Sequence, residues 1–224
     1  MTTTAVRRVL LANPNSNTAA TGRMVAAARD AAPDWLRVEG YTTAASPALI
    51  VDDAGGEVAE TAVAVAAGRD FGGFDGVIVS AYIDPGIDRV RAALPVPVVG
   101  IGEASMRAAA AVGRFSVAMT TPGLVDWVRR YAERLGLAAR LASIPCTTDE
   151  PHALMADPDR VLAALDGLIR RAVAEDGAEA VVIGGGPLAD AARTLAATSP
   201  VPLIEPVPAA VREMAARLAG EEDR

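Results

Sequence analysis

Short runs of apolar residues alternate along the chain with longer stretches in which apolar positions recur at helical spacing. The short runs are rich in Val, Ile and Leu and lack alternating polar positions, which is typical of parallel strands buried on both faces. The predicted strands are 6–11, 36–41, 76–80, 96–101, 115–120, 141–144, 180–183 and 201–204. The predicted helices between them include 18–31, 58–69, 123–135, 158–175 and 209–219. The pattern predicts an α/β protein with helices on both faces of its sheets.

Two stretches of the chain, 75–109 and 178–216, follow the same order of elements. Each reads as a strand, a turn of small residues, a helix, a Pro-Val-Pro strand start, an acidic residue and an Ala-rich helix. A weaker match pairs VLLANPNSN with FSVAMTTPG. The repeat predicts two similar lobes, residues 1–99 plus 206–224 and residues 100–205, as interleaved halves of one compact unit. Because ligands of open α/β sheets bind at the carboxyl ends of strands, we expect one site between the lobes.

Composition narrows the class of protein. Hydrophobic residues make up 51% of the 224 residues, enough for a sizeable core. The net charge of −7 argues against a nucleic-acid partner and against an anionic membrane surface. No apolar stretch is long enough for a signal peptide or a membrane span. The one cysteine, Cys146, cannot form an internal disulfide, so we expect a soluble enzyme of the reducing cytoplasm.

Polar loops follow four of the predicted strands and would meet in the cleft. In the first, Asn13, Asn15 and Ser16 precede a helix, and amide donors at a helix N-terminus suit a carboxylate. The alternative is an Asn/Pro turn with a helix cap. In another, the hydroxyls of Thr120 and Thr121 precede a helix that begins with proline. These two loops are candidate substrate-binding loops.

The loop after the strand at 76–80 carries Ser80, Ala81, Tyr82 and Asp84. Tyr82 either donates a hydrogen bond from its phenol in the cleft or packs as a half-buried ring. Asp84 either takes part in acid–base chemistry or belongs to an Asp-Pro-Gly turn and cap. Ser80 and Ala81 are candidate binding residues, and Tyr82 and Asp84 are candidate catalytic residues.

The fourth loop is Gly184-Gly185-Gly186-Pro187, where the missing side chains let a ligand approach the backbone. With Ala189, its glycines also have the spacing of a dinucleotide-binding fingerprint. Too little chain follows this loop for a dinucleotide domain, and its partner in the repeat lacks the glycines. We therefore expect Gly185, Gly186 and Pro187 to contact a substrate and not a dinucleotide.

Four further residues are candidates. Glu103 and Glu205 occupy matched positions in the repeat, so they form either a pair of acid–base carboxylates or two helix caps. Cys146 could reach the cleft or be a small buried apolar residue. His152 could supply a proton or be a solvated loop residue. No His, Cys and carboxylate cluster has the spacing of metal ligands, so we expect no metal site.

The segments LLANPNSN, DGVIVSAYIDPG, VPVVGIGEASMRAA and EDGAEAVVIGGGPLAD resemble the hydantoin racemase branch of the aspartate/glutamate/hydantoin racemase superfamily, and the likeness spans residues 6–218. The resemblance implies two pseudo-symmetric flavodoxin-like lobes, an active-site cleft between them and a homo-oligomer. It implies catalysis without metal or pyridoxal phosphate, in which one thiolate removes an α-proton and an opposite thiol returns a proton. Those two cysteines fall on Ala81 and Gly185, and neither residue can exchange a proton.

The resemblance also implies that the family's oxyanion-binding groups are kept in Asn13, Ser16, Thr120, Thr121 and the amides of Gly185 and Gly186. The leading hypothesis is a cofactor-independent enzyme that acts on a small carboxylate or cyclic amide by isomerisation, elimination or decarboxylation. Its protons would come from Tyr82, Asp84, Glu103, Cys146 or His152. The alternatives are a racemase with substitute bases and a non-catalytic protein that binds such a ligand.

Overall fold

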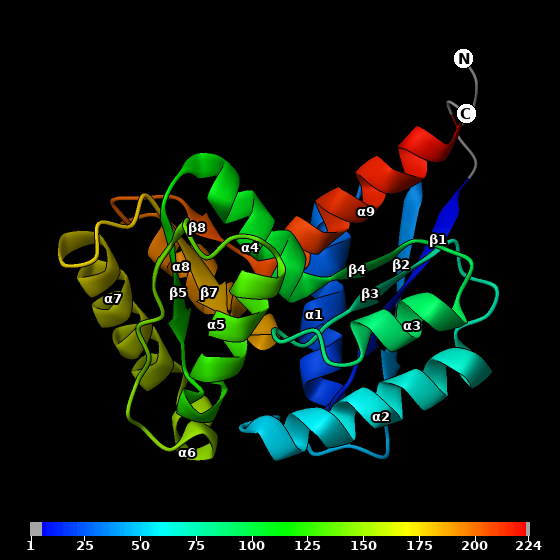
Figure 1. Cartoon of the computed structure of the whole chain (residues 1–224), viewed down its shortest axis with the longest axis horizontal. Coiled ribbons are helices and arrows are strands. Elements are labelled where there is room, and N and C mark those ends of the chain that lie inside the picture. Colours follow the sequence, from blue (N-terminus) through cyan, green and yellow to red (C-terminus); the bar gives the residue numbers. More distant parts are fainter. Residues whose placement is uncertain (1–5, 223–224) are drawn as a thin grey trace.

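The computed structural model describes residues 6–222, which form two four-stranded parallel sheets (Figure 1). The strands are β1 Arg7–Asn13, β2 Leu36–Thr42, β3 Gly76–Val79, β4 Val98–Gly100, β5 Phe115–Met119, β6 Leu141–Ser143, β7 Ala180–Gly184 and β8 Leu203–Ile204. The first sheet has the order β2-β1-β3-β4 and the second the order β6-β5-β7-β8. The α/β prediction is therefore confirmed, and the two lobes share one flavodoxin-like strand order.

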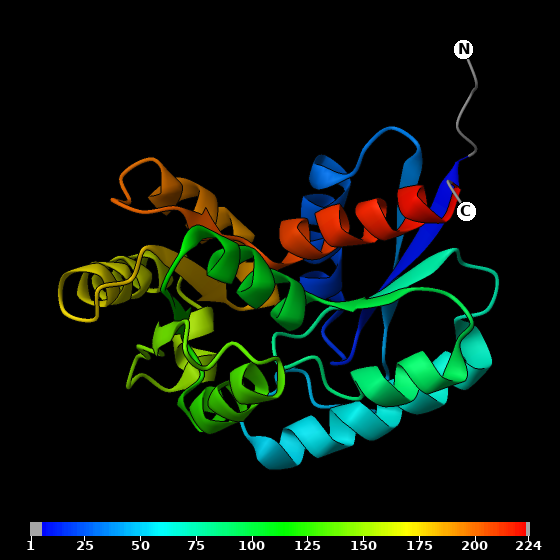
Figure 2. The same ribbon diagram turned by 45° about the horizontal axis from the view of Figure 1, so that its top comes forward.

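Helices cover both faces of each sheet (Figure 2). The helices and 3₁₀ turns are α1 Thr18–Ala31, α2 Asp53–Asp70, α3 Ile87–Ala93, α4 Ile101–Val112, η1 Pro122–Leu124, α5 Val125–Arg134, α6 Pro151–Met155, α7 Pro158–Ala174, η2 Gly186–Leu188, α8 Ala189–Ala196 and α9 Pro206–Glu222. Among residues 6–222, no helix is long and apolar enough to cross a membrane.

Strand β1 shows why the strands read as continuous apolar runs. Val9 and Leu11 pack in a cluster with residues of α1 and α9, whereas Leu10 and Ala12 pack with residues of α2 and α3. Successive side chains of a strand point to opposite faces, so where helices cover both faces, as at residues 9–12, successive positions are all apolar. The last helix, α9, thereby returns to the first sheet. We keep the lobe boundaries predicted at 99/100 and 205/206 as a proposal.

Two strands begin later than the apolar pattern predicts. The expected starts at 96 and 201 precede Pro97 and Pro202, which have no backbone N–H for the ladder. Accordingly, β4 begins at Val98 and β8 at Leu203. Helix α2 begins earlier than predicted, because the side chain of Asp52 accepts a hydrogen bond from the Gly55 amide and caps the helix.

Candidate active site

A small cavity of about 70 Å³, the main pocket, lies at the carboxyl ends of strands from both sheets. All four loops singled out in the sequence contribute to it, as expected for α/β sheets. The predicted residues that line it are Asn15, Ser80, Ala81, Tyr82, Thr120, Thr121, Gly185, Gly186 and Pro187. The structure thus brings together loops from near the two ends of the sequence, as Asn15 and Pro187 show.

The first loop is held in shape by its own side chains. Asn13 is fully buried and donates from Nδ2 to Oδ1 of Asn15, 2.9 Å away. Oδ1 of Asn15 also accepts from the backbone amide of Asn17, the residue that caps α1. The amide N–H groups of the Asn15 side chain are therefore the part free to donate to a ligand. Asn13 and Ser16 do not line the main pocket, and the Ser16 backbone amide donates to the carbonyl of Pro47.

The hydroxyls of the other loops differ in availability. Ser80 Oγ donates to the carbonyl of Ala12 at 3.0 Å, so this hydroxyl is already engaged. Thr120 and Thr121 are 3% and 8% exposed, and within residues 6–222 no hydrogen bond engages their hydroxyls. The backbone amide of Gly186 likewise has no acceptor in the described part of the chain. Two hydroxyls and one backbone amide of residues that line the main pocket therefore have no acceptor among the described residues.

Tyr82 brings a phenol to the main pocket. The residue is 6% exposed, and its hydroxyl has no hydrogen-bond partner among the described residues. The hydroxyl oxygen itself is closed to solvent, so the Tyr82 side chain has to turn before a ligand atom can bond it. Burial raises the pKa of the Tyr82 phenol above its usual range. At neutral pH the group is therefore a proton donor and not a base.

The two positions where the family resemblance places cysteines, Ala81 and Gly185, both line the main pocket. Neither side chain can ionise. A Cβ built on Gly185 would lie 2.8 Å from Cδ1 of Leu188, so the Leu188 side chain lies against the space that a residue 185 side chain would take. The main pocket therefore has donors for an anion but no thiol at either position.

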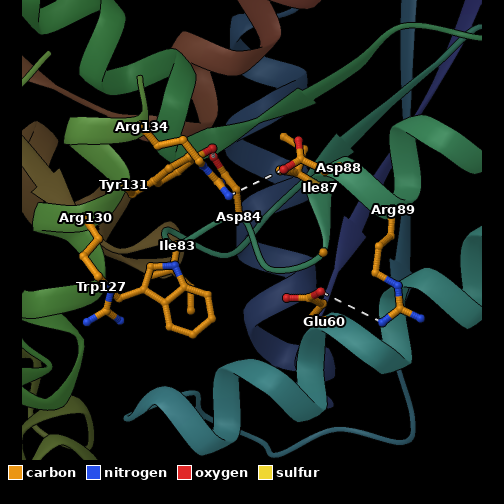
Figure 3. Close-up of a pocket in the computed structure, with 11 residues that line it drawn as sticks. Glu60, Ile83, Asp84, Ile87, Asp88, Arg89, Trp127, Arg130, Tyr131 and Arg134 are labelled. Atoms are coloured by element: carbon orange, nitrogen blue, oxygen red, sulfur yellow. Dashed lines mark hydrogen bonds and ion pairs between the residues drawn. The ribbon is translucent and has the colours of Figure 1, made fainter. Parts of the chain in front are cut away.

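Asp84 lies outside the main pocket and lines a separate cavity of about 290 Å³, the side pocket, between α2, α3 and α5 (Figure 3). Its carboxylate accepts hydrogen bonds from the amides of Gly102 and Glu103 at 3.0 and 2.8 Å and from the Tyr131 hydroxyl at 2.7 Å. Asp84 thereby caps the N-terminus of α4 and joins it to α5. Burial raises the pKa of Asp84 to about 8, and the nearby Glu103 adds to the rise.

Glu103 and Glu205 also lie outside the main pocket. Glu103 is buried, accepts from the Gly100 amide at 3.2 Å and pairs with Arg91, which is the geometry of a capping residue. Glu205 is half-buried and lies 3.5 Å from Nε of Arg193. The structure therefore does not bring the two matched carboxylates together on one ligand cavity.

Cys146 and His152 do not line the main pocket either. Cys146 is half-buried, and its backbone forms an isolated β-bridge with Met119. Burial raises the pKa of the Cys146 thiol. His152 is exposed on α6, where Glu150 caps the helix and accepts from its backbone amide. Among the side chains that the structure describes, no three of His, Cys, Asp or Glu are grouped closely enough to hold a metal ion.

Sequence reasoning missed one whole wall of the main pocket. This wall is apolar and consists of Met24, Leu49, Ile50, Ile83, Leu124, Met155 and Leu188. Leu49 and Ile50 belong to a loop between β2 and α2 with no periodic pattern, and Met155 ends the short helix α6. A polar pattern at strand ends could locate the donors, but nothing in the sequence marked these apolar residues as ligand contacts.

The contact between Asp84 and α4 leads to a stability prediction. A Cβ on Gly102 would collide with the carbonyl oxygen of Tyr82, which is backbone and cannot move aside alone. We expect Gly102→Ala to lower the free energy of unfolding by about 2 kcal/mol in urea titrations. The control is Gly68→Ala in α2, where a Cβ meets nothing within 4 Å. It should stabilise by about 0.5–1 kcal/mol, and equal effects of both variants would contradict the packing described here.

Comparisons with known proteins agree with this geometry. The sequence model of the Asp/Glu/hydantoin racemase family matches residues 9–214. Hydantoin racemase of Paenarthrobacter aurescens is 30% identical over 209 residues, which cover 92% of this chain and 88% of the relative. The structure of allantoin racemase from Klebsiella pneumoniae has a TM-score of 0.89 at 30% identity and covers 96% of this chain and 89% of its own. That of Pseudomonas fluorescens allantoin racemase has a TM-score of 0.91 at 26% identity, with 96% and 92% covered.

Proposed function

Because the chain belongs to the Asp/Glu/hydantoin racemase family, we propose that it is a cofactor-independent enzyme whose chemistry does not use a pair of thiols. Its substrate is a small carboxylate or a cyclic amide of the hydantoin class, and the reaction passes through an enolate-like intermediate. One observation carries the proposal: the main pocket keeps its hydrogen-bond donors, while Ala81 and Gly185 offer no ionisable group.

The donors of the main pocket suit the charge of an enolate. The Asn15 side-chain amide, the hydroxyls of Thr120 and Thr121 and the Gly186 backbone amide come from three separate loops. A carboxylate or a ring carbonyl held by such fixed donors gains negative charge as the intermediate forms, and each donor then binds more strongly. The protein thereby stabilises the intermediate more than the bound substrate.

The protonation state of Tyr82 favours a reaction that does not begin with removal of a proton. Its raised pKa makes it a poor base at neutral pH and a possible acid. In a decarboxylation, the bond from the α-carbon to the carboxylate breaks, its electron pair enters the enolate, and CO₂ leaves. Tyr82 then delivers a proton to the α-carbon and is reprotonated from water. Elimination and isomerisation remain the other two forms of the proposal.

The test is proton NMR in D₂O with a panel of chiral hydantoins, amino acids, substituted malonates and unsaturated diacids. A new product identifies a lyase or an isomerase together with its substrate class. Loss of an α-proton signal without a new compound identifies exchange at carbon. If no compound of the panel changes, the proposal is wrong.

A conservative variant tests the donors directly. Thr121→Val keeps the shape of the side chain and removes a hydroxyl that no other group engages. We expect its affinity for the active compound of the panel to fall about tenfold, since a hydrogen bond to an anion contributes roughly 1.5–3 kcal/mol. Titration calorimetry measures the effect. Thr198→Val, at an exposed residue distant from the main pocket, is the control and should bind as wild type does.

Two alternatives have support of their own. The named relatives are hydantoin and allantoin racemases, which favours racemisation with substitute bases. The described residues that line the main pocket include no carboxylate, thiol or imidazole, which favours a non-catalytic protein that binds the same ligands. Tight binding without turnover in the panel would support the second alternative.

We further propose a cytoplasmic, homo-oligomeric protein with no nucleic-acid or membrane partner. The single cysteine and the net charge of −7 support the location and the absence of these partners. The family resemblance supports the assembly.

A further inference from the structure

One face of α2 carries apolar side chains that are open to solvent. Val58 and Val65 are 49% and 60% exposed, and they are two of the four large apolar side chains exposed among residues 6–222. An open groove of about 730 Å³ runs along this face, between α2 and residues 41–45 at the end of β2. The helix lies on the outside of the first lobe (Figures 1 and 2), and no residue of the groove lines the main pocket.

The residues along this face are arranged symmetrically. Its central stripe consists of Ala54, Val58, Thr61, Ala62, Val65 and Arg69. The intervals between them are 4, 3, 1, 3 and 4 residues, which read the same from either end of the helix. At 3.6 residues per turn these positions share one side of α2, and the midpoint of the stripe lies between Thr61 and Ala62. The stripe therefore matches itself when a second copy lies antiparallel, with Val58 of one copy against Val65 of the other.

The matching helix of the second lobe has an ordinary solvated surface. Helix α7 follows the edge strand β6 as α2 follows the edge strand β2. Its exposed residues include Arg160, Arg170 and Arg171, and each of these side chains forms an ion pair within the chain. The two sheets have the same strand order, so the fold does not require an exposed apolar stripe at this place.

We infer that α2 forms the interface of a two-fold symmetric dimer, in which the α2 helices of two copies of this chain pack antiparallel about an axis between Thr61 and Ala62. Two-fold dimers are the commonest homo-oligomers, and in them one surface patch meets itself. The contact removes Val58 and Val65 of both copies from water, and the small side chains at its centre let the helices approach closely. The inference rests on the proposed homo-oligomer and not on the proposed chemistry.

The charges near the ends of the stripe favour the same arrangement. The antiparallel register places Arg69 of one copy about one helical turn from Glu57 of the other, and both residues are exposed in the groove. Arg69 bonds Asp70 through Nε and Nη2, which leaves Nη1 to donate to Glu57. A parallel arrangement would place Glu57 beside Glu57 and Arg69 beside Arg69, so repulsion between like charges opposes it.

Sedimentation velocity over a range of concentrations tests the interface with Val65→Glu. The change puts a carboxylate against Val58 and beside Glu57 of the other copy, whereas glutamate itself suits an exposed position of a helix. The dissociation constant of the dimer should rise at least about a hundredfold, because both contacts between Val58 and Val65 are lost. Circular dichroism checks that the variant is folded.

Val112→Glu is the matched control. Val112 is 49% exposed at the end of α4 and does not line the groove. The control variant makes the same change of side chain on another surface, so it should assemble as wild type does.

Cysteine cross-linking in a Cys146→Ala background tests the register. For antiparallel helices about 9 Å apart, the two Thr61 Cα atoms lie about 6 Å apart across the axis, which a disulfide can span. Thr61→Cys should therefore give a disulfide-linked dimer on mild oxidation. Gly68→Cys is the control, since residue 68 is exposed two turns further along the same side of α2, and its two copies lie about 20 Å apart.

Each result bears on the inference. If Val65→Glu and Val112→Glu assemble equally well, or if Thr61→Cys cross-links no better than Gly68→Cys, the inference is overturned and the proposed homo-oligomer stands. If wild type sediments as a monomer at every concentration, the inference and the proposed homo-oligomer are both wrong, and the proposed chemistry is unaffected.

Discussion

Cysteines at both Ala81 and Gly185 are expected to raise α-proton exchange of 5-benzylhydantoin at least about a thousandfold over wild type. Both positions line the main pocket, whose donors are already in place. A positioned acid or base contributes typically about 10²–10⁴-fold, and exchange with inversion needs one on each face of a planar intermediate. Loss of the α-proton signal in D₂O and loss of optical rotation measure the two effects.

The matched control is the double variant with Ala81→Ser and Gly185→Ser, which has nearly the same shape but no group that ionises near neutral pH. It should stay at the wild-type rate. Because a residue 185 side chain meets Leu188, the double cysteine variant is also made with Leu188→Ala. If both cysteine variants fold and bind the hydantoin but show no α-proton exchange, residues 81 and 185 do not face one substrate.

Asp84→Ala is expected to lower the free energy of unfolding by about 4 kcal/mol. The change removes the acceptor of the Gly102 and Glu103 amides and of the Tyr131 hydroxyl, all of which are buried at this point. It also places alanine at a φ of 45°, a conformation that Asp and Asn tolerate better. Urea unfolding measures the loss. The exposed Asp88→Ala is the control, with an effect within about 0.5 kcal/mol, and a similar small effect for Asp84→Ala would contradict its role as a cap.

The same carboxyl should make stability depend on pH. Its pKa is raised to about 8 in the folded chain, whereas an unfolded Asp has a pKa near 3.9. As pH rises above about 4, Asp84 therefore ionises in the unfolded chain first, and its contribution to stability is lost by about pH 8. Asp84→Asn is neutral at every pH, so its stability relative to wild type should improve by about 3 kcal/mol from pH 5 to 7.5. An unchanged difference would show that Asp84 is ionised in the folded protein.

The sequence was sufficient to predict the sheets and the meeting of the four loops. Buried strands such as β3 and β7 leave a clear pattern of β-branched runs, and polar residues at strand ends mark the ligand edge of the sheets. Pro97 and Pro202 have no backbone N–H to donate to the sheet, so β4 and β8 begin only at the residues after them. The cap at Asp52 extended α2 into a stretch that reads as a turn.

Which side of a loop each residue faces could not be predicted. Ala81 and Tyr82 face the main pocket, Ile83 contributes to both pockets, and Asp84 turns to the α4 N-terminus. That turn depends on a left-handed backbone at Asp84 and on contact with Tyr131, which is 47 residues away in the sequence. The catalytic roles of Asp84 and Glu103 remain predictions. In the structure, both carboxylates accept hydrogen bonds from backbone amides at the N-terminus of α4.

Turnover by a variant without any cysteine would show that the reaction uses no thiol. Cys146 is the single cysteine of the chain and does not line the main pocket. Wild type and Cys146→Ala are compared in D₂O with 5-benzylhydantoin and benzylmalonate, by proton NMR for exchange and by CO₂ release for decarboxylation. We predict that both proteins turn over at least one compound, at rates that agree within about twofold. Turnover that disappears with Cys146, or turnover in neither protein, would contradict an enzyme that works without thiols.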